Sequence, residues 1–159
     1  MVRVAVLTVS DSVSRGSSED RSGPAVVEAC RARQWEVVTT AVLADDREAI
    51  EGRLREWADS GAYEMILTTG GTGIGPRDVT PEATAAVCET LIPGLAEEMR
   101  RKGLESTPRA VLSRSVAGVR GTTLIVNLPG SPKGAAESLA AIASLLPHAA
   151  QIIRGARHE

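Results

Sequence analysis

The stretch LTTGGTGIGPRDVTPEAT, from Leu67 to Thr84, contains the residues of this chain that are best suited to holding phosphate. Four of the six residues from 70 to 75 are glycine, and they directly follow an apolar run. Glycine lets the backbone approach a ligand closely, and successive N–H groups in such turns form concave anion sites. We therefore predict a phosphate cradle here, with a tight turn at positive φ as the structural alternative.

Two well-known glycine motifs do not match this loop. A P-loop ends in Gly-Lys followed by Ser or Thr, and no such step closes the segment. The dinucleotide fingerprint needs GxGxxG running directly into a helix, whereas Gly71, Gly73 and Gly75 are spaced GxGxG. The loop is thus predicted to bind phosphate without belonging to either class.

A carboxylate follows the loop at Asp78, just before a predicted helix with Thr80 as its N-cap and Pro81 at its first position. Asp78 could simply complement the helix dipole. The functional alternative is a metal site, because Mg²⁺ usually binds one or two carboxylates together with substrate phosphates. Asp45 or Asp46 could supply the second carboxylate from a neighbouring strand end, and the pair favours the metal site.

A second phosphate site is predicted at NLPGSPKG, residues 127–134. Ser131 is suited to cap a helix and Pro132 to occupy its first turn. Free N–H groups and the positive end of the helix dipole would then face a ligand. Lys133 would add a positive charge, and a merely solvated lysine is an equal alternative.

Alternating strand and helix patterns explain how these loops would meet. Short, β-branched apolar runs predict strands at 2–10, 36–43 and 64–69. Helical spacing predicts helices from Ser22 and at 47–60, 81–92 and 95–103. Two apolar runs within 110–130 predict a hairpin, followed by a helix at 131–146, an interruption at Pro147 and a last turn to Arg154. We expect an α/β fold with a mixed, mostly parallel sheet and helices on both faces, in a single domain at 1–159.

In open parallel sheets, ligands bind beyond the carboxyl ends of the strands. The predicted strands end in polar segments at 10–12, 45–46, 68–78 and 127–131. If the strands are parallel, these four segments lie along one edge of the sheet. Serine, threonine, aspartate and glycine dominate them, a composition that favours one shared site for phosphate and metal.

Composition excludes several classes of function. The 159 residues are 43% apolar and 24% charged, with a net charge of -2. They include no Phe, one Tyr and two Trp, so no nucleic-acid partner is expected. No apolar run at the N-terminus is long enough for a membrane helix and no cleavage site follows it, which favours a cytoplasmic protein with no membrane partner.

Cysteine and histidine chemistry is not indicated either. Cys30 and Cys88 form no CxxC motif and are expected to be buried and reduced. The two histidines fall in no zinc-ligand or catalytic-triad spacing. Near the chain end, Arg154, Arg157 and His158 are expected to form a solvated tail.

The segments TVSDS, LTTGGTGIGPRDVTPEAT, LSRSVAGVRGTTLIVNLPGSPKG and LPHAAQIIRG together resemble the Mog/MoaB family of molybdenum-cofactor biosynthesis proteins, which includes the G domain of gephyrin. The resemblance covers nearly the whole chain. It implies a mixed α/β fold assembled as a homotrimer. It also implies Mg²⁺-dependent transfer of an adenylyl group from ATP to molybdopterin, with release of pyrophosphate. Because no second catalytic domain is attached, a separate molybdenum-insertion protein would receive the product.

The resemblance also implies roles for individual residues. Asp45 and Asp78 match the functionally critical aspartates of the family and are the expected catalytic and metal-binding residues. The expected nucleotide site comprises Gly70, Gly71, Thr72, Gly73, Ser10 and Asp11. The expected molybdopterin site comprises Pro129, Gly130, Ser131 and Lys133.

The intact segment PRDVTPE favours the adenylyltransferase branch over MoaB members in which this segment is altered. Two alternatives stay open. One is a carrier or scaffold that binds molybdopterin without adenylylating it, and the other is an unrelated nucleotide-dependent enzyme on a similar fold. Release of pyrophosphate in the presence of molybdopterin would distinguish the three.

Overall fold

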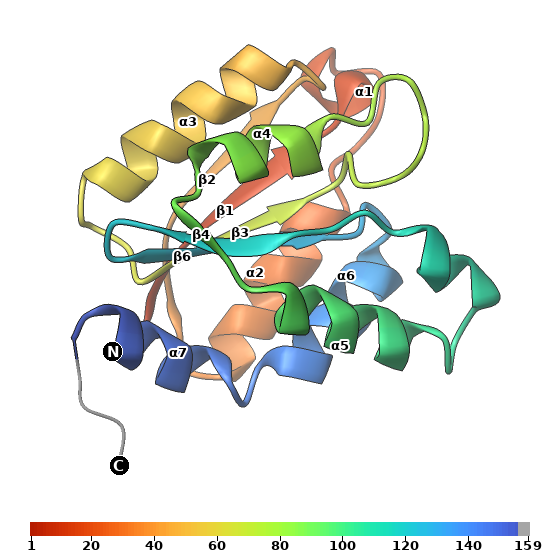
Figure 1. The fold of residues 1–159 in the computed structure, drawn as a ribbon. Helices are drawn as coiled ribbons and strands as arrows, with labels where there is room; N and C mark the ends of the chain where they lie inside the picture. Colours follow the sequence, from red (N-terminus) through yellow and green to blue (C-terminus); the bar gives the residue numbers. More distant parts are fainter. Residues whose placement is uncertain (156–159) are drawn as a thin grey trace.

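The computed structural model describes residues 1–155, which form one sheet with helices on both faces (Figure 1). The strands are β1 (Arg3–Val9), β2 (Glu36–Leu43), β3 (Met65–Thr69), β4 (Thr90–Leu91), β5 (Ala117–Arg120) and β6 (Thr123–Leu128). The helices are α1 (Asp11–Ser14), α2 (Ser22–Ala32), α3 (Arg47–Asp59), α4 (Thr80–Val87), α5 (Pro93–Gly103), the 3-10 helix η1 (Pro108–Leu112), α6 (Pro132–Ile142) and α7 (Leu146–Ile153).

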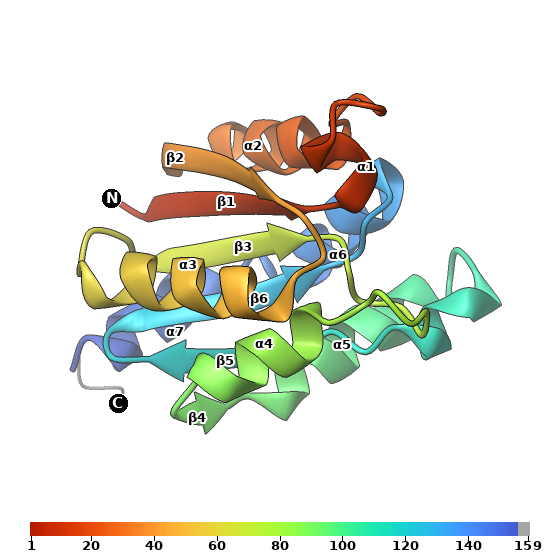
Figure 2. The same ribbon diagram turned by 90° about the horizontal axis from the view of Figure 1, so that it is seen from above.

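The strand order is β2-β1-β3-β6-β5-β4. The first four of these strands are parallel, and β5 runs antiparallel to both β6 and β4. The predicted mixed, mostly parallel sheet and the β5–β6 hairpin are therefore confirmed. From β1 the chain moves outward to β2 and returns on the other side of β1 for β3, as Figure 2 shows. A crevice is expected where this reversal occurs.

Side chains of the central strands alternate between the two faces of the sheet. Val4 and Val6 belong to the apolar cluster covered by α2, α5, α6 and α7, whereas Ala5 and Leu7 belong to the cluster covered by α3 and α4. Every residue of β3 and β6 is buried, as expected for strands inside a parallel sheet. These strands give the loops at their carboxyl ends a rigid base.

The helix predicted at 81–92 is wrong beyond Val87. Cys88 has an extended backbone, and the residues after it form the edge strand β4. The amides of Glu89 and Ile92 each donate to a carbonyl of β5 at 2.8 Å. Pairing with a strand distant in the sequence therefore overrides the helical spacing of the apolar residues.

The closing helix also differs from its prediction. It breaks after α6, which ends at Ile142, and α7 begins at Leu146. Pro147 lies in the first turn of α7 and does not interrupt the helix. Proline is favourable there because the first N–H groups of a helix have no partner within the helix.

No helix within residues 1–155 is by itself long and apolar enough to cross a membrane. Only α6 and α7 taken together have that length and composition, and a bend of 64° separates them. Both helices contribute buried side chains to the core, such as Leu139 and Leu146, and core helices pass the same test.

Both cysteines are free thiols. Cys30 is buried in α2 as expected, whereas Cys88 is only partly buried. Burial is the main cause that raises the pKa of each thiol to about 11. Both thiols are therefore protonated at neutral pH and poor nucleophiles.

A cluster of charges lies at the edge of the sheet where β1 and β3 begin. Glu64 accepts hydrogen bonds from the Arg3 amide at 2.7 Å and from the Arg3 guanidinium at 2.6 and 3.0 Å. Arg154, at the end of α7, lies 3.1 Å from the same carboxylate. Arg154 is therefore exposed, as expected, but paired with Glu64, and Arg157 and His158 lie outside the described residues.

Replacement of Glu64 by Gln is predicted to destabilise the fold by about 1–3 kcal/mol at neutral pH, because several hydrogen bonds to a carboxylate are weakened. The hydrogen bond from Arg3 is the largest cause that lowers the pKa of Glu64. The stabilisation is present above the pKa of this carboxyl in the unfolded chain and is lost as the pH falls through the lower folded pKa. Urea unfolding of both proteins at pH 7 and at about pH 3 measures this. An equal difference in stability at the two pH values would contradict the assignment.

Candidate active site

The carboxyl ends of β1, β3 and β6 meet in direct backbone contact. The Gly70 amide donates to the Leu128 carbonyl at 3.1 Å, and Thr69 Oγ1 donates to the Pro129 carbonyl at 2.6 Å. Gly70 has a φ of +104°, and a Cβ at this position would collide with the Val9 carbonyl of β1. Only glycine fits at this position, and its lack of a side chain lets the three strand ends come together.

The glycine loop encloses two carboxylates. A Cβ at Gly71 would lie 3.0 Å from Asp45 Oδ1. Cβ atoms at Gly73 and Gly75 would lie 2.9 and 3.0 Å from Asp78 Oδ2, which also accepts a hydrogen bond from the Gly75 amide at 2.9 Å. The missing side chains therefore make room for the protein's own carboxylates as well as for any ligand.

Asp11 links Asp45 to the glycine loop. The Asp11 amide donates to Asp45 Oδ2 at 2.9 Å, and the Asp45 amide donates to Asp11 Oδ1 at 3.0 Å. Arg77 donates to both oxygens of Asp11, at 3.0 and 3.1 Å, and this hydrogen bonding lowers the pKa of Asp11. Asp11 thus supports Asp45 and carries a paired charge.

Asp45 faces the site, whereas Asp46 does not. Asp46 caps α3 by accepting a hydrogen bond from the Glu48 amide at 3.1 Å, but Asp45 lines a cavity together with Asp78. Burial is the main cause that raises the pKa of Asp45, and the negative charges of Asp11 and Asp78 act in the same direction. A cation between Asp45 and Asp78 would relieve this repulsion.

Two cavities open at this edge of the sheet. The larger, of about 620 Å³, lies among the glycine loop, α5, η1 and α6. The smaller, of about 360 Å³, lies beyond the ends of β1 and β3. Gly71, Asp78 and Gly130 line both cavities. Their sizes suit small ligands.

The predicted site residues divide between these cavities. The larger is also lined by Thr72, Gly73, Pro129 and Ser131, and the smaller by Ser10, Asp45 and Gly70. Asp11 and Lys133 line neither. The structure thus brings most of the predicted nucleotide and molybdopterin residues to one place, with Asp11 behind them.

The two aspartates have oxygens available for a cation. Within residues 1–155, the Oδ1 atoms of Asp45 and Asp78 accept no hydrogen bond, and each Oδ2 accepts one from an amide. Such oxygens fit Mg²⁺, which prefers oxygen ligands and often keeps substrate phosphates and water in its shell. In the described part of the chain, no three Asp, Glu, His or Cys side chains are grouped to hold a metal, so Mg²⁺ would need ligands from a substrate.

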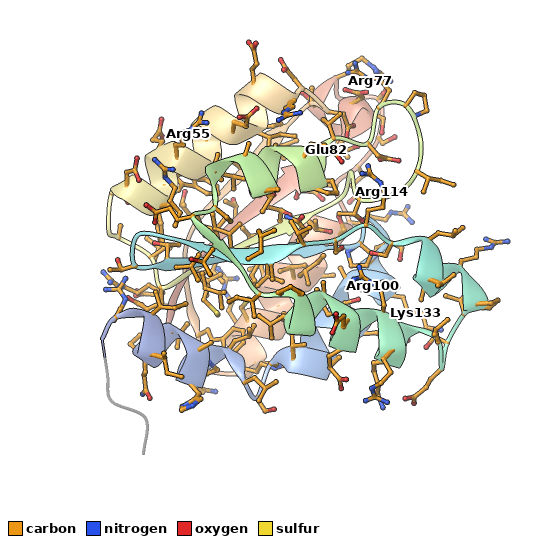
Figure 3. All side chains as sticks on the ribbon, viewed as in Figure 1. Arg55, Arg77, Glu82, Arg100, Arg114 and Lys133 are labelled. Carbon is orange, nitrogen blue, oxygen red and sulfur yellow. The ribbon has the colours of Figure 1, made fainter. Side chains whose placement is uncertain are left out.

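The amino end of α6 matches its prediction in part. Ser131 caps the helix by accepting a hydrogen bond from the Gly134 amide at 3.0 Å. The Lys133 side chain, labelled in Figure 3, is 82% exposed. It lies 3.9 Å from Glu137 on the same helix. The helix amino end and its amides supply positive potential here, and the exposed Lys133 side chain lines neither cavity.

Two predictions at the strand ends are wrong. Thr80 is not an N-cap but the first residue of α4, and its fully buried Oγ1 has no hydrogen-bond partner in the described chain. This hydroxyl packs against Gly71. Asn127 does not face the crevice, because it lies buried in β6 and its Nδ2 donates to the hydroxyls of Thr68 and Thr84, each at 2.9 Å. Asn127 thus joins the sheet to α4.

Three arginines near the site were not predicted from the sequence. Arg100 and Arg109 line the larger cavity, and Arg114 donates to the Gly73 carbonyl at 2.7 Å. Arg100 also donates to backbone carbonyls. Arg100 and Arg114 bind main-chain carbonyls, and such acceptors leave no pattern in the sequence. The only signal for Arg114 is that it lies within LSRSVAG, one of the segments that carry the family resemblance.

Known proteins are similar to this chain along nearly its whole length. Residues 5–148 match the family model described as "probable molybdopterin binding domain". The molybdopterin adenylyltransferase of Helicobacter pylori is 40% identical over 156 residues, which cover 97% of this chain and 89% of that protein. The molybdopterin adenylyltransferase of Escherichia coli is 40% identical over 141 residues, which cover 87% of this chain and 72% of that protein.

Solved structures show the same fold. The molybdopterin biosynthesis enzyme MoaB of Thermus thermophilus matches 100% of both chains with a TM-score of 0.92 and 50% identity. The molybdopterin biosynthesis Mog protein of Mycobacterium ulcerans matches 96% of this chain and 99% of its own, with a TM-score of 0.89 and 40% identity. The expected fold is confirmed, and the chain belongs to the family of molybdopterin-binding domains that includes the Mog and MoaB proteins.

Proposed function

We propose that this protein is a molybdopterin adenylyltransferase, which transfers AMP from ATP to molybdopterin and releases pyrophosphate. The observation that supports this most directly is the placement of Asp45 and Asp78 on one cavity wall beside the glycine loop. The names of the similar adenylyltransferases support the substrates and the reaction. ATP is then the co-substrate and Mg²⁺ the proposed cofactor.

The reaction joins two phosphate groups. A phosphate oxygen of molybdopterin attacks the α-phosphorus of ATP and forms a new P–O bond. The bond from that phosphorus to the bridging oxygen breaks, and its electron pair leaves with pyrophosphate. No electron acceptor and no nucleophile from the protein are required, so catalysis depends on positioning and charge stabilisation.

The residues of the site supply both the positioning of the substrates and the stabilisation of charge. Gly71, Asp78 and Gly130 line both cavities, so substrates in the two cavities would meet at this wall. The amides of the glycine loop and of the α6 amino end, which Ser131 caps, would hold phosphate oxygens. Asp45 and Asp78 would hold Mg²⁺, which stabilises negative charge on phosphate oxygens when it is bound.

The proposal extends to organisation and partners. One continuous sheet supports a single molybdopterin-binding domain at 1–159. A cytoplasmic location is proposed from the reaction, and the adenylylated product would pass to a separate molybdenum-insertion protein. A homotrimer is proposed from the family resemblance.

Purified protein supplied with ATP, Mg²⁺ and molybdopterin is expected to form adenylyl-molybdopterin and pyrophosphate in equal amounts. Mass spectrometry of the pterin and an enzymatic pyrophosphate assay measure the two products. Omission of molybdopterin, the control, should stop pyrophosphate release. Molybdopterin binding without pyrophosphate release would instead indicate a carrier or scaffold, and tight binding of another nucleotide without pterin affinity would indicate an unrelated enzyme.

Replacement of Asp78 or Asp45 by Asn is expected to lower kcat by about 10²-fold or more, because an amide supplies no charge for a cation at the reacting phosphates. Asp46→Asn is the matched control: it removes the neighbouring carboxylate but keeps a side chain that can cap α3. Steady-state kinetics on the three folded variants decides this. Equal losses in all three would exclude a specific role for Asp45 and Asp78.

The protein is expected to assemble as a homotrimer in solution. Sedimentation equilibrium over a range of protein concentrations should give three times the mass of one chain. A monomer mass over the whole range would contradict the trimer.

A further inference from the structure

Arg114 connects three parts of the segment that carries Asp78. Its Nε donates to the Gly73 carbonyl at 2.7 Å, its Nη2 donates to the Asp78 carbonyl at 2.8 Å, and its Nη1 binds the Glu82 carboxylate of α4. Figure 3 shows the Arg114 and Glu82 side chains close together near the start of α4. We propose that Arg114 is a positioning residue that fixes where Asp78 presents its carboxylate. This inference rests on the proposed adenylyl transfer.

The glycine loop has few backbone hydrogen bonds of its own. Residues 74–77 are all exposed. Backbone hydrogen bonds within the described loop join the Asp78 amide to the Gly75 carbonyl at 3.1 Å and the Thr80 amide to the Gly71 carbonyl at 3.2 Å. Glycines add conformational freedom to such a segment. The ion pair of Arg77 with Asp11 holds one point of the exposed turn. Arg114 supports the turn from outside, because it binds the carbonyls at residues 73 and 78 on either side of it.

Arg114 is itself well anchored. Its amide donates to the Thr72 carbonyl at 2.9 Å. The carbonyls of Ser113 and Ser115 on either side of it accept hydrogen bonds from Arg100 of α5 at 3.1 and 3.3 Å. The guanidinium thus extends from a fixed segment between η1 and β5 to the glycine loop, where it binds the Gly73 and Asp78 carbonyls.

The arrangement requires arginine in particular. A guanidinium offers five N–H donors in a rigid plane, so it can reach two carbonyls and a carboxylate together. A lysine ammonium is a compact charge on a flexible stem, and it can keep the ion pair with Glu82 without spanning both carbonyls. Lysine at position 114 therefore separates the geometric contribution of Arg114 from its charge.

Arg120, at the end of β5, provides a matched control. It donates to both oxygens of Asp59, at 2.9 and 3.2 Å, and to the Val87 carbonyl at 3.0 Å. Its side chain is 25% exposed, compared with 35% for Arg114, and it lies at the far end of β5. The same type of contact is therefore lost in Arg120→Ala without any change beside Asp78.

The kinetic test compares Arg114→Ala, Arg114→Lys and Arg120→Ala with the wild type. Both Arg114 variants are expected to lower kcat by about 10²-fold with a smaller change in KM for ATP, because a displacement of about 1 Å has effects of that size. Arg120→Ala should lose thermal stability and keep kcat. In an Asp78→Asn background, Arg114→Ala should cause no further loss, since both changes affect the same carboxylate.

Amide hydrogen exchange of the Gly75 N–H gives a readout that needs no turnover. This amide donates to Asp78 Oδ2, so its protection reports the position of the carboxylate. Exchange at Gly75 is expected to become about tenfold faster or more in both Arg114 variants and to stay unchanged in Arg120→Ala.

Wild-type kcat and wild-type Gly75 protection in Arg114→Lys would overturn the proposal, and this variant keeps the test decisive if Arg114→Ala does not fold. Full additivity of Arg114→Ala with Asp78→Asn would overturn it as well, because the two residues would then act independently. A wild-type protein without turnover would refute the proposed function instead. In that case, Gly75 exchange would still test whether Arg114 fixes Asp78.

Discussion

The site depends on the close packing of three strand ends around Gly70. On one side Gly70 lies against the Val9 carbonyl, and on the other a Cβ added to Gly130 would lie 3.3 Å from Gly70 Cα. With no side chain between them, the loops that follow β1, β3 and β6 leave the sheet from almost the same point. The parallel order of these strands then places carboxylates, loop amides and a helix amino end around one crevice.

This convergence creates an electrostatic requirement. Asp45 and Asp78 line the same cavity, and the charge of Asp78 contributes to raising the pKa of Asp45. Two carboxylates repel a phosphate group, whereas loop amides and the α6 amino end attract it. In the proposed reaction, a cation between the two aspartates would offset this repulsion, so the amides and the metal would act together. The ion pair of Asp11 with Arg77 keeps that nearby charge neutralised.

Pattern in the sequence predicts the parts of this structure that local chemistry determines. Buried strands, the hairpin, the Ser131 cap and the polar strand ends follow from hydrophobic period and capping preference. Sequence patterns fail where contacts with distant segments determine the conformation. Cys88 leaves the helical conformation because the residues after it pair with β5. Two adjacent aspartates look equivalent in sequence, but Asp46 caps α3 and Asp45 faces the cavity. Arg114 was missed because two of its three side-chain acceptors are main-chain carbonyls.

The central claim is that Asp45 and Asp78 together hold a metal at the reacting phosphates. A crystal grown with Mn²⁺ and a non-hydrolysable ATP analogue tests it most directly, because anomalous scattering locates the metal independently of the nucleotide. The account predicts a single peak about 2 Å from an oxygen of each aspartate and from a phosphate oxygen. A metal bound only by the nucleotide, away from both aspartates, would contradict it.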